Sequence, residues 1–212
     1  MDELKPEKLI KENEKIRVDA YGKVTSKTRF IGDCSRNDLL HGAVARSSVA
    51  HGRIISIKNI EDIKAMPGVR AVVMASDIPG DNVVPFVKQD YPCLAETEVK
   101  FIGQPIALVA ADTDLLAKDA ADAFEIEYEE YPAVFDFIQA LRPDSEYVGG
   151  DDNIHSSYKI RKGDVERGFA GSDVIVEAVF TTKHQVHCYL ENQGVIAEHA
   201  RSGGLDLFGS MQ

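Results

Sequence analysis

Three residues near the carboxyl end of the chain have side chains that commonly bind metals: His184, His187 and Cys188. Imidazole nitrogens and thiolates are frequent zinc ligands. The surrounding sequence alternates as in a β-strand, and residues three apart on a strand point to opposite faces. At most His184 and Cys188 would then share a face. The pattern therefore favours a polar strand edge, with a small buried thiol at Cys188, over a metal centre.

A second candidate site is the run FEIEYEE, in which Glu125, Glu127 and Glu129 alternate with apolar or aromatic residues. Paired carboxylates can act as general acid and base. A period of two, however, places these three glutamates on one exposed face of a strand. The pattern is therefore typical of a solvated strand rather than of a catalytic pair.

The tripeptide Gly103-Gln104-Pro105 precedes the apolar run IALVAA. Glycine and proline fix the backbone of tight turns, and a glutamine there can hold a loop in place, so we interpret it as a turn rather than a ligand site. The sequence contains neither GxGxxG nor GxxxxGK. A free-standing nucleotide-binding protein with a phosphate loop is thereby disfavoured.

The composition limits the classes of partner. The 212 residues are 44% hydrophobic, which is ordinary for a globular protein with a core. The net charge of −11 argues against nucleic acids and anionic membranes, which require clustered lysine and arginine. The 3 cysteines form no CxxC pair, so neither a disulfide framework nor an iron–sulfur cradle is predicted. The first fifteen residues, MDELKPEKLIKENEK, contain no apolar run, so we expect no secretory signal and a cytoplasmic setting.

The elements that position these residues begin with a domain of class α/β (α+β) over residues 16–141, after a charged arm at 1–15. Strands are expected at 40–46, 53–57 and 69–74, and Asn59 is expected to cap a short helix between the last two. A second strand–helix–strand unit is expected over 106–129, with its helix capped by Asp112 or Thr113. The apolar face of that helix is predicted to consist of Leu116, Ala120, Ala123 and Phe124.

The sequence pattern changes after residue 141. Residues 142–154 are rich in proline, glycine and acidic side chains, and we interpret them as a linker. Over 155–212 we expect a short helix at 163–169 and then antiparallel strands in VIVEAVF, YLENQGVIAEH and LDLFGSMQ. Because so little sheet leaves an unpaired edge and a marginal core, we predict a truncated second domain that resists proteolysis less than the first.

An ordered series of motifs resembles the large subunit of the xanthine dehydrogenase and aldehyde oxidase family. RVDAYGKVTSKTRFIGD, from Arg17, is similar to the family's leading pattern, with Ser26 where the family has glycine. LLHGAVARSSVAHGRIISI, MPGVRAVVMASDIPG and VKFIGQPIALVAA resemble its hammerhead domain. GDVERGFAGSDVIVEAVF and HQVHCYLENQGVIAE resemble the start of its molybdopterin-binding domain, with Glu191 in a Leu-Glu element. The matching residues of the leading pattern are Asp19, Lys23, Val24, Thr25, Phe30 and Asp33.

This resemblance implies an alpha/beta hammerhead domain followed by the truncated start of a mixed, mainly antiparallel molybdopterin-binding domain. It implies an oxidoreductase whose molybdenum is held by the dithiolene sulfurs of molybdopterin, so no metal ligand is expected from this chain. The family's Ser-x-Gln element ends in a glutamine whose amide donates to an oxygen ligand of molybdenum, and that cofactor-binding role falls on Gln212. The family's catalytic glutamate lies beyond residue 212, so we expect no catalytic residue here and no turnover by this chain alone.

The resemblance also implies partners. These are 2Fe-2S and FAD domains or subunits, the remainder of the molybdopterin-binding subunit, and a small-molecule substrate. We expect that substrate to be a purine such as xanthine or hypoxanthine, a related N-heterocycle or an aldehyde. The alternative is a noncatalytic scaffold that docks the iron–sulfur and flavin subunits. A reading frame that continues past Gln212 into further pterin loops favours the enzyme, and a stop codon there favours the scaffold.

Overall fold

The computed structural model describes residues 17–34, 36–84, 91–148 and 152–211. By their contacts these residues form two compact units. The smaller unit consists of the described residues up to Asn37 and those from Val176 onward. The larger unit consists of the described residues of Asp38–Ile175. This grouping follows contacts and not sequence order. The predicted boundaries near residues 141 and 155 stay a prediction.

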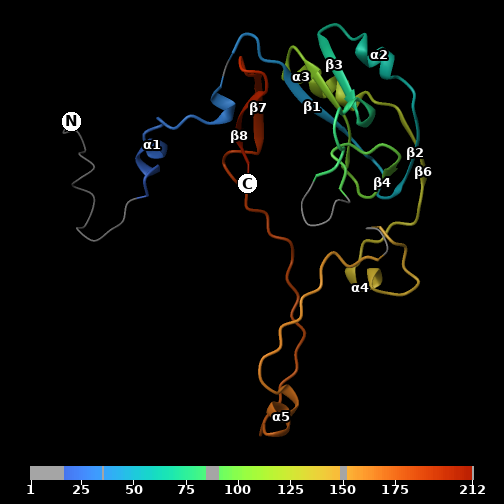
Figure 1. The fold of residues 1–212 in the computed structure, drawn as a ribbon, viewed down its shortest axis with the longest axis vertical. Helices are drawn as coiled ribbons and strands as arrows, with labels where there is room; N and C mark the ends of the chain where they lie inside the picture. The colour runs from blue at the N-terminus through green and yellow to red at the C-terminus, as the bar shows by residue number, and fades with distance from the viewer. Residues whose placement is uncertain (1–16, 35, 85–90, 149–151, 212) are drawn as a thin grey trace, which may run out of the picture. The chain divides into compact units, whose positions relative to one another are not determined.

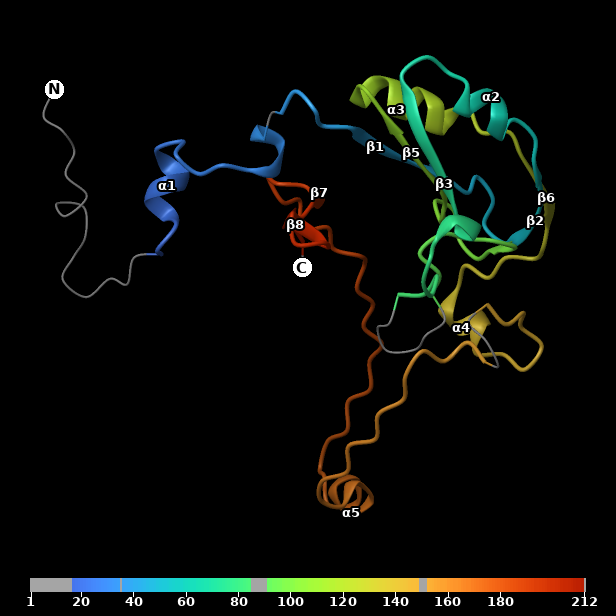
Figure 2. The same cartoon turned by 45° about the horizontal axis from the view of Figure 1, so that its top comes forward.

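The larger unit contains a first antiparallel sheet with β5 (Pro105–Ala111) at its centre. β1 (His41–Arg46) and β3 (Val69–Met74) pair with β5 on either side. Figure 1 labels β1 and β3, and Figure 2 shows β5 between them. A central strand covered on its faces is expected to be a nearly continuous apolar run, and β5 reads PIALVAA. The predicted strands at 40–46, 69–74 and 106–111 are therefore confirmed.

A second antiparallel sheet of the same unit has β2 (Gly52–Ile57) between β4 (Glu98–Val99) and β6 (Ile126–Glu130). Helix α2 (Ile60–Lys64) connects β2 to β3, and helix α3 (Asp114–Asp122) connects β5 to β6. Both predicted strand–helix–strand units are confirmed, and each has one strand in each sheet. The two strand–helix–strand motifs therefore connect the two sheets.

The first turns of the two helices differ in how they are held. Asn59 stands at the N-cap of α2, but its side chain makes no capping bond, so the predicted role was wrong. Its amide instead donates to the Ala123 carbonyl at 2.7 Å and accepts the Glu125 N–H at 2.9 Å, joining α2 to the end of α3. Thr113 caps α3, because its Oγ1 accepts the Leu116 N–H at 3.2 Å.

The buried face of α3 consists of Ala117, Ala120 and Ala121, with Leu116 and Phe124 half-buried beside them. The prediction was wrong for Ala123, which is exposed because it follows the last helical turn as the C-cap. This face packs against the first sheet in a cluster with Ala45, Val72, Ala107 and Val109. A smaller cluster, Ala95, Val99 and Ile106, lies under the second sheet.

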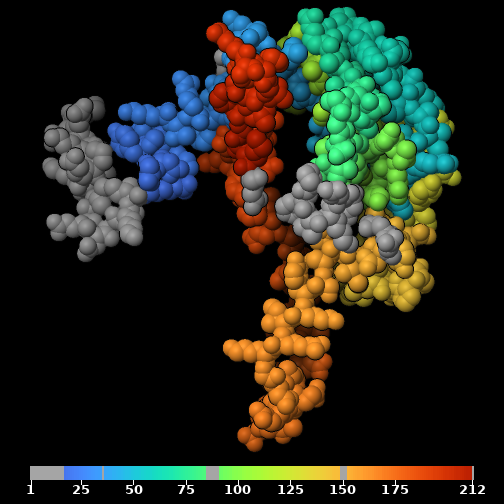
Figure 3. Space-filling view, in the orientation of Figure 1, coloured from blue at the N-terminus to red at the C-terminus, as the bar shows by residue number. Residues whose placement is uncertain are grey.

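The remaining elements of the larger unit are the 3₁₀ helix η3 (Ala75–Asp77) and two short helices, α4 (Phe137–Ala140) and α5 (Val165–Ala170). α5 confirms the predicted helix at 163–169, and Figure 3 shows the chain around it as a narrow column of atoms. The run VIVEAVF is not a strand, contrary to prediction, and its Phe180 is 90% exposed. An alternating sequence forms a strand only when a neighbour pairs with it, and none of the described strands pairs with these residues.

The smaller unit contains α1 (Ala20–Val24), the 3₁₀ helix η2 (Ile31–Asp33) and a hairpin of β7 (Gly194–His199) and β8 (Leu205–Ser210). The strands pair in the register Gly194 with Ser210 and His199 with Leu205. The predicted turn at Gly203-Gly204 is confirmed, because the Ala200 N–H donates to the Gly204 carbonyl at 3.0 Å. The predicted strand YLENQGVIAEH was too long, since pairing begins only at Gly194.

Candidate functional site

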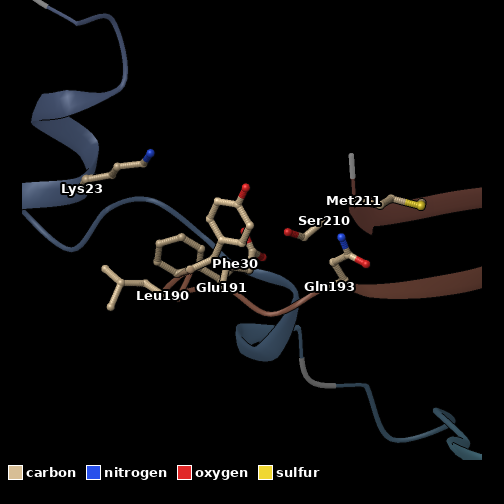
Figure 4. A pocket seen from close by; sticks show the side chains of 8 residues that line it. Lys23, Phe30, Leu190, Glu191, Gln193, Ser210 and Met211 are labelled. Carbon is tan, nitrogen blue, oxygen red and sulfur yellow. The ribbon is translucent and has the colours of Figure 1, made fainter. Parts of the chain in front are cut away.

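A cavity of about 560 Å³ lies entirely within the smaller unit. In Figure 4, Lys23 reaches it from α1 on one side, Gln193, Ser210 and Met211 stand at the strand ends on the other, and Phe30 and Glu191 lie between them. The wall combines aromatic and aliphatic groups with an ammonium, a carboxylate, an amide and a hydroxyl. The full lining is Lys23, Phe30, Tyr189, Leu190, Glu191, Gln193, Ser210 and Met211.

Lys23 is held by its own helix. Its Nζ lies 2.7 Å from Asp19 Oδ2, one helical turn earlier. The hydrogen bond from Lys23, with a second contribution from Arg17, lowers the pKa of the Asp19 carboxyl below its usual value. The lysine therefore keeps a carboxylate partner at neutral pH while it borders the cavity.

The end of α1 shows why glycine would suit the position that Ser26 occupies in this chain. Ser26 has φ of 57°, in the left-handed region that glycine adopts without strain. The Lys27 N–H donates to the Gly22 carbonyl at 2.8 Å and the Ser26 N–H to the Lys23 carbonyl at 3.3 Å. These two bonds form a Schellman motif, so the turn after Lys23 is made despite the serine.

Phe30 precedes η2 and is fixed by two carboxylates. The Phe30 N–H donates to Asp33 Oδ2 at 2.9 Å, and the next N–H, that of Ile31, donates to Glu191 Oε1 at 2.8 Å. The second bond joins residues that are far apart in the sequence. It places the aromatic residue of the leading segment at the same cavity as the residues that flank β7.

Gln212, the one residue predicted to bind the cofactor, lies outside the described residues. Its neighbours Ser210 and Met211 are described, and both line the cavity. Among the lining residues, the Lys23 ammonium would suit the phosphate of molybdopterin, and the Gln193 amide and the Ser210 hydroxyl would suit its polar ring system.

His184, His187 and Cys188 do not lie on a strand, so the geometric argument made from the sequence does not apply to them. Cys188 is exposed and has φ of 51°, which corrects the prediction of a buried thiol. The His187 and Tyr189 rings stack at 5.3 Å. Within the described part of the chain, no three histidine, cysteine or acidic residues are grouped as metal ligands.

The turn and the acidic strand behave as predicted. Gln104 is 2% exposed and its Oε1 accepts the Lys100 N–H at 2.7 Å, while Gly103 has φ of 87°. Glu127 lies on the exposed face of β6, 3.2 Å from Lys58 Nζ, and hydrogen bonds from Lys58 and then Ser56 lower the pKa of its carboxyl.

Two family models match the chain in succession. Residues 25–132 match the a/b hammerhead domain of aldehyde oxidase and xanthine dehydrogenase, and residues 148–212 match the molybdopterin cofactor-binding domain. The chain belongs to the aldehyde oxidase and xanthine dehydrogenase family. It is thus part of a family of molybdenum-containing oxidoreductases, and its second matched region is similar to a molybdopterin cofactor-binding domain.

Relatives from the family are longer than this chain. The nicotinate dehydrogenase large molybdopterin subunit of Eubacterium barkeri is 36% identical over 93% of this chain and 46% of that protein. A probable xanthine dehydrogenase subunit from Bacillus subtilis is 35% identical over 96% of this chain and 27% of that protein. The chain therefore spans less than half of either relative.

Solved structures show the same fold. Quinoline 2-oxidoreductase from Pseudomonas putida 86 matches with a TM-score of 0.80 and 29% identity, covering 93% of this chain and 26% of that one. Aldehyde oxidoreductase from Desulfovibrio gigas matches with a TM-score of 0.79 and 28% identity, covering 91% and 23%. Among the described residues, no helix has the length and apolar character needed to cross a membrane.

Sequence reasoning assigned no role to most residues that line the cavity. Lys23 and Phe30 matched the family's leading pattern, and Ser210 belongs to the Ser-x-Gln element, so a signal existed for these three. Gln193 stands within the motif HQVHCYLENQGVIAE but was assigned no role. Glu191 was noticed as a motif residue without its partner Ile31.

Proposed function

We propose that this chain supplies the hammerhead domain, residues 16–141, and the beginning of the molybdopterin-binding domain, residues 155–212, of a molybdenum hydroxylase of the xanthine dehydrogenase type. The observation that carries the proposal is the order of the two family matches along one chain. The partial coverage of the relatives supports a cofactor site completed by protein outside these residues.

The bound cofactor supplies oxidative hydroxylation of an electron-poor carbon with oxygen derived from water. In this proposal the chain's own residues bind and orient the cofactor. The Gln212 amide donates a hydrogen bond to a cofactor oxygen, and Lys23, Gln193 and Ser210 hold its polar groups. The general base belongs to the remainder of the subunit.

The substrate in this proposal is a purine such as xanthine, a related N-heterocycle or an aldehyde. The names of the matched relatives, which include nicotinate dehydrogenase, xanthine dehydrogenase and aldehyde oxidase, support this range. Separate 2Fe-2S and FAD subunits are proposed as partners in a cytoplasmic complex. Several relatives are named as single subunits, among them the gamma subunit of the 6-hydroxypseudooxynicotine dehydrogenase complex, which supports a divided complex.

The test is to purify the native complex through a tag on this chain and to measure molybdenum, pterin, iron and flavin. We expect all four, together with oxidation of at least one of xanthine, hypoxanthine, nicotinate or an aldehyde and incorporation of ¹⁸O from labelled water. Gln212→Ala is expected to lower kcat by about 10²-fold, as for other lost hydrogen-bond donors to a reacting oxygen. A complex without molybdenum and pterin that oxidises none of these compounds would refute the proposal.

The second candidate is a noncatalytic scaffold. The observation in its favour is the exposed apolar run at 174–180, which suits protein docking. A scaffold would retain the iron–sulfur and flavin subunits in the purification but no molybdenum, so the same measurements separate the two candidates.

A further inference from the structure

One side-chain contact joins the leading segment to the residues ahead of β7. Glu191 Oε1 accepts the Ile31 N–H at 2.8 Å, and the bond is partly buried. A carboxylate that accepts an N–H makes a charge-assisted bond, which is stronger than a neutral one. Because the bond is also partly buried, it is less open to water than an exposed contact.

Two further contacts lie along the same segment. The Ile31 Cγ2 atom is 3.6 Å from the position of a Cβ on Gly194, so the isoleucine packs on the first residue of β7. Arg36 forms two bonds to the carboxylate of Glu198, at 2.7 and 3.1 Å. That ion pair is nearly half-exposed on both sides, where such pairs contribute little. We therefore expect the loss of Glu191 to affect this segment more than the loss of Glu198.

We propose that Glu191 is a positioning residue for the cofactor site: its carboxylate holds residues 30–33 against the turn before β7 and so fixes Phe30 across the cavity from Ser210. The inference rests on the proposed function, in which Gln212, two residues after Ser210, binds the cofactor. Without the carboxylate, the Ile31 N–H loses its acceptor. The segment that carries Phe30 is then no longer bonded to the residues before β7.

The proposed role needs an acceptor oxygen and not a titrating group. Glutamine keeps an oxygen at the same position, whereas alanine removes it. Glu191→Gln should therefore recover most of what Glu191→Ala loses. Glu177→Ala is the matched control, because Glu177 is an exposed carboxylate of the same unit with no partner shown among the described residues.

The first experiment measures hydrogen–deuterium exchange at the Ile31 amide in the full chain. We expect Glu191→Ala to speed exchange by about tenfold or more, as for loss of a bond to a charged acceptor. Glu191→Gln is expected near the wild type, and Glu177→Ala at the wild-type rate. Protection of the β7–β8 hairpin, which belongs to the same unit as Ile31, reports whether each variant is folded there. Equal Ile31 exchange in the wild type and Glu191→Ala, with the hairpin protected, would overturn the inference.

The second experiment uses the native complex and measures bound molybdenum by mass spectrometry alongside kcat and KM. Glu191→Ala is expected to lower molybdenum occupancy several-fold, with recovery in Glu191→Gln. Faster Ile31 exchange with unchanged occupancy, kcat and KM would show a structural contact only and would overturn the positioning role. A wild-type complex that lacks molybdenum would instead refute the proposed function, so the two failures are distinguishable.

Discussion

The strands β5 and β8 both carry large apolar side chains but differ greatly in burial. Most of β5 is buried, and Ile106, Ala107 and Ala111 have no exposed surface. In β8 no residue is buried, although LDLFGS contains three large apolar side chains. β5 has a strand on each side and α3 over one face, whereas β8 pairs only with β7 among the described residues. The large apolar side chains of a strand are thus buried only where neighbouring elements cover them.

The largest expected effect is a difference in amide exchange between β5 and residues 174–180, which, like β8, lack the neighbours that β5 has. The β5 amides are expected to open only with the whole unit, while the residues at 174–180 have no strand to protect them. We expect exchange to be slower in β5 by about 10³-fold or more, as for a globally protected core. Limited proteolysis should cut first within 155–190. Equal protection of both regions would break the comparison.

A matched pair of side-chain truncations, one in β5 and one in β8, tests the same comparison through stability. Ile106→Ala empties a fully buried site in β5 and should reduce the free energy of unfolding by about 2–5 kcal/mol. Leu207→Ala changes a β8 residue that is 59% exposed, so we expect a loss of about 0.5 kcal/mol or less. Urea unfolding followed by circular dichroism measures both. A larger loss at Leu207 would show that β8 is covered in solution.

Two glycines of the larger unit separate backbone strain from crowding. A Cβ on Gly68, at φ of 89°, would lie 2.7 Å from Leu116 Cδ2. Gly103 has φ of 87° but open space around it. We expect Gly68→Ala to cost about 2–4 kcal/mol from strain and overpacking together, and Gly103→Ala about 1–2 kcal/mol from strain alone. Gly42→Ala, without either problem, is the control in the same unfolding assay.

In the smaller unit, one substitution at the end of α1 is expected to increase stability. Ser26→Gly should relieve the left-handed strain in the Schellman motif and stabilise the turn by about 0.5–1 kcal/mol. Slower exchange of the Lys27 amide would report it. Thr25→Gly, at an ordinary C-cap conformation, should destabilise α1 instead. A loss of protection in Ser26→Gly would contradict the proposed geometry.

The smallest effect expected is a pH dependence of the larger unit. The Arg70 guanidinium bonds the Asp112 carboxylate at 2.7 Å and lowers the pKa of that carboxyl below its usual 3.8. The folded pKa is depressed, so the contribution is present above pH 3.8 and disappears as pH falls through the lowered value. Both side chains are exposed, which keeps it small. The stability difference between the wild type and Arg70→Met should therefore vanish in acid, and a difference that grows there would be contrary evidence.

The sequence predicted the larger unit well because its signals are local. Apolar runs, Thr113 and Pro67-Gly68 mark where strands and helices begin and end. What local signals could not show is that the two strands of each strand–helix–strand unit enter different sheets. Asn59 illustrates this limit: its capping pattern was present, but its amide bonds Ala123 and Glu125 instead.

The site was less predictable because it is assembled from distant parts. Lys23 and Phe30 precede the larger unit in the sequence, whereas Gln193 and Ser210 follow it. No periodicity connects them, and the bond between Ile31 and Glu191 exists only after folding. The resemblance identified some of the residues through their motifs, and geometry was needed to show that they share one cavity.

The position of β5 in the chain has a consequence during translation. β5 is the central strand of its sheet, yet both of its neighbours, β1 and β3, precede it and leave the ribosome first. At about 5–20 residues per second, the nascent chain presents two unpaired strand edges for several seconds before the strand that joins them is made. Chaperone contacts on this protein should therefore concentrate on β1 and β3 and end once β5 has emerged.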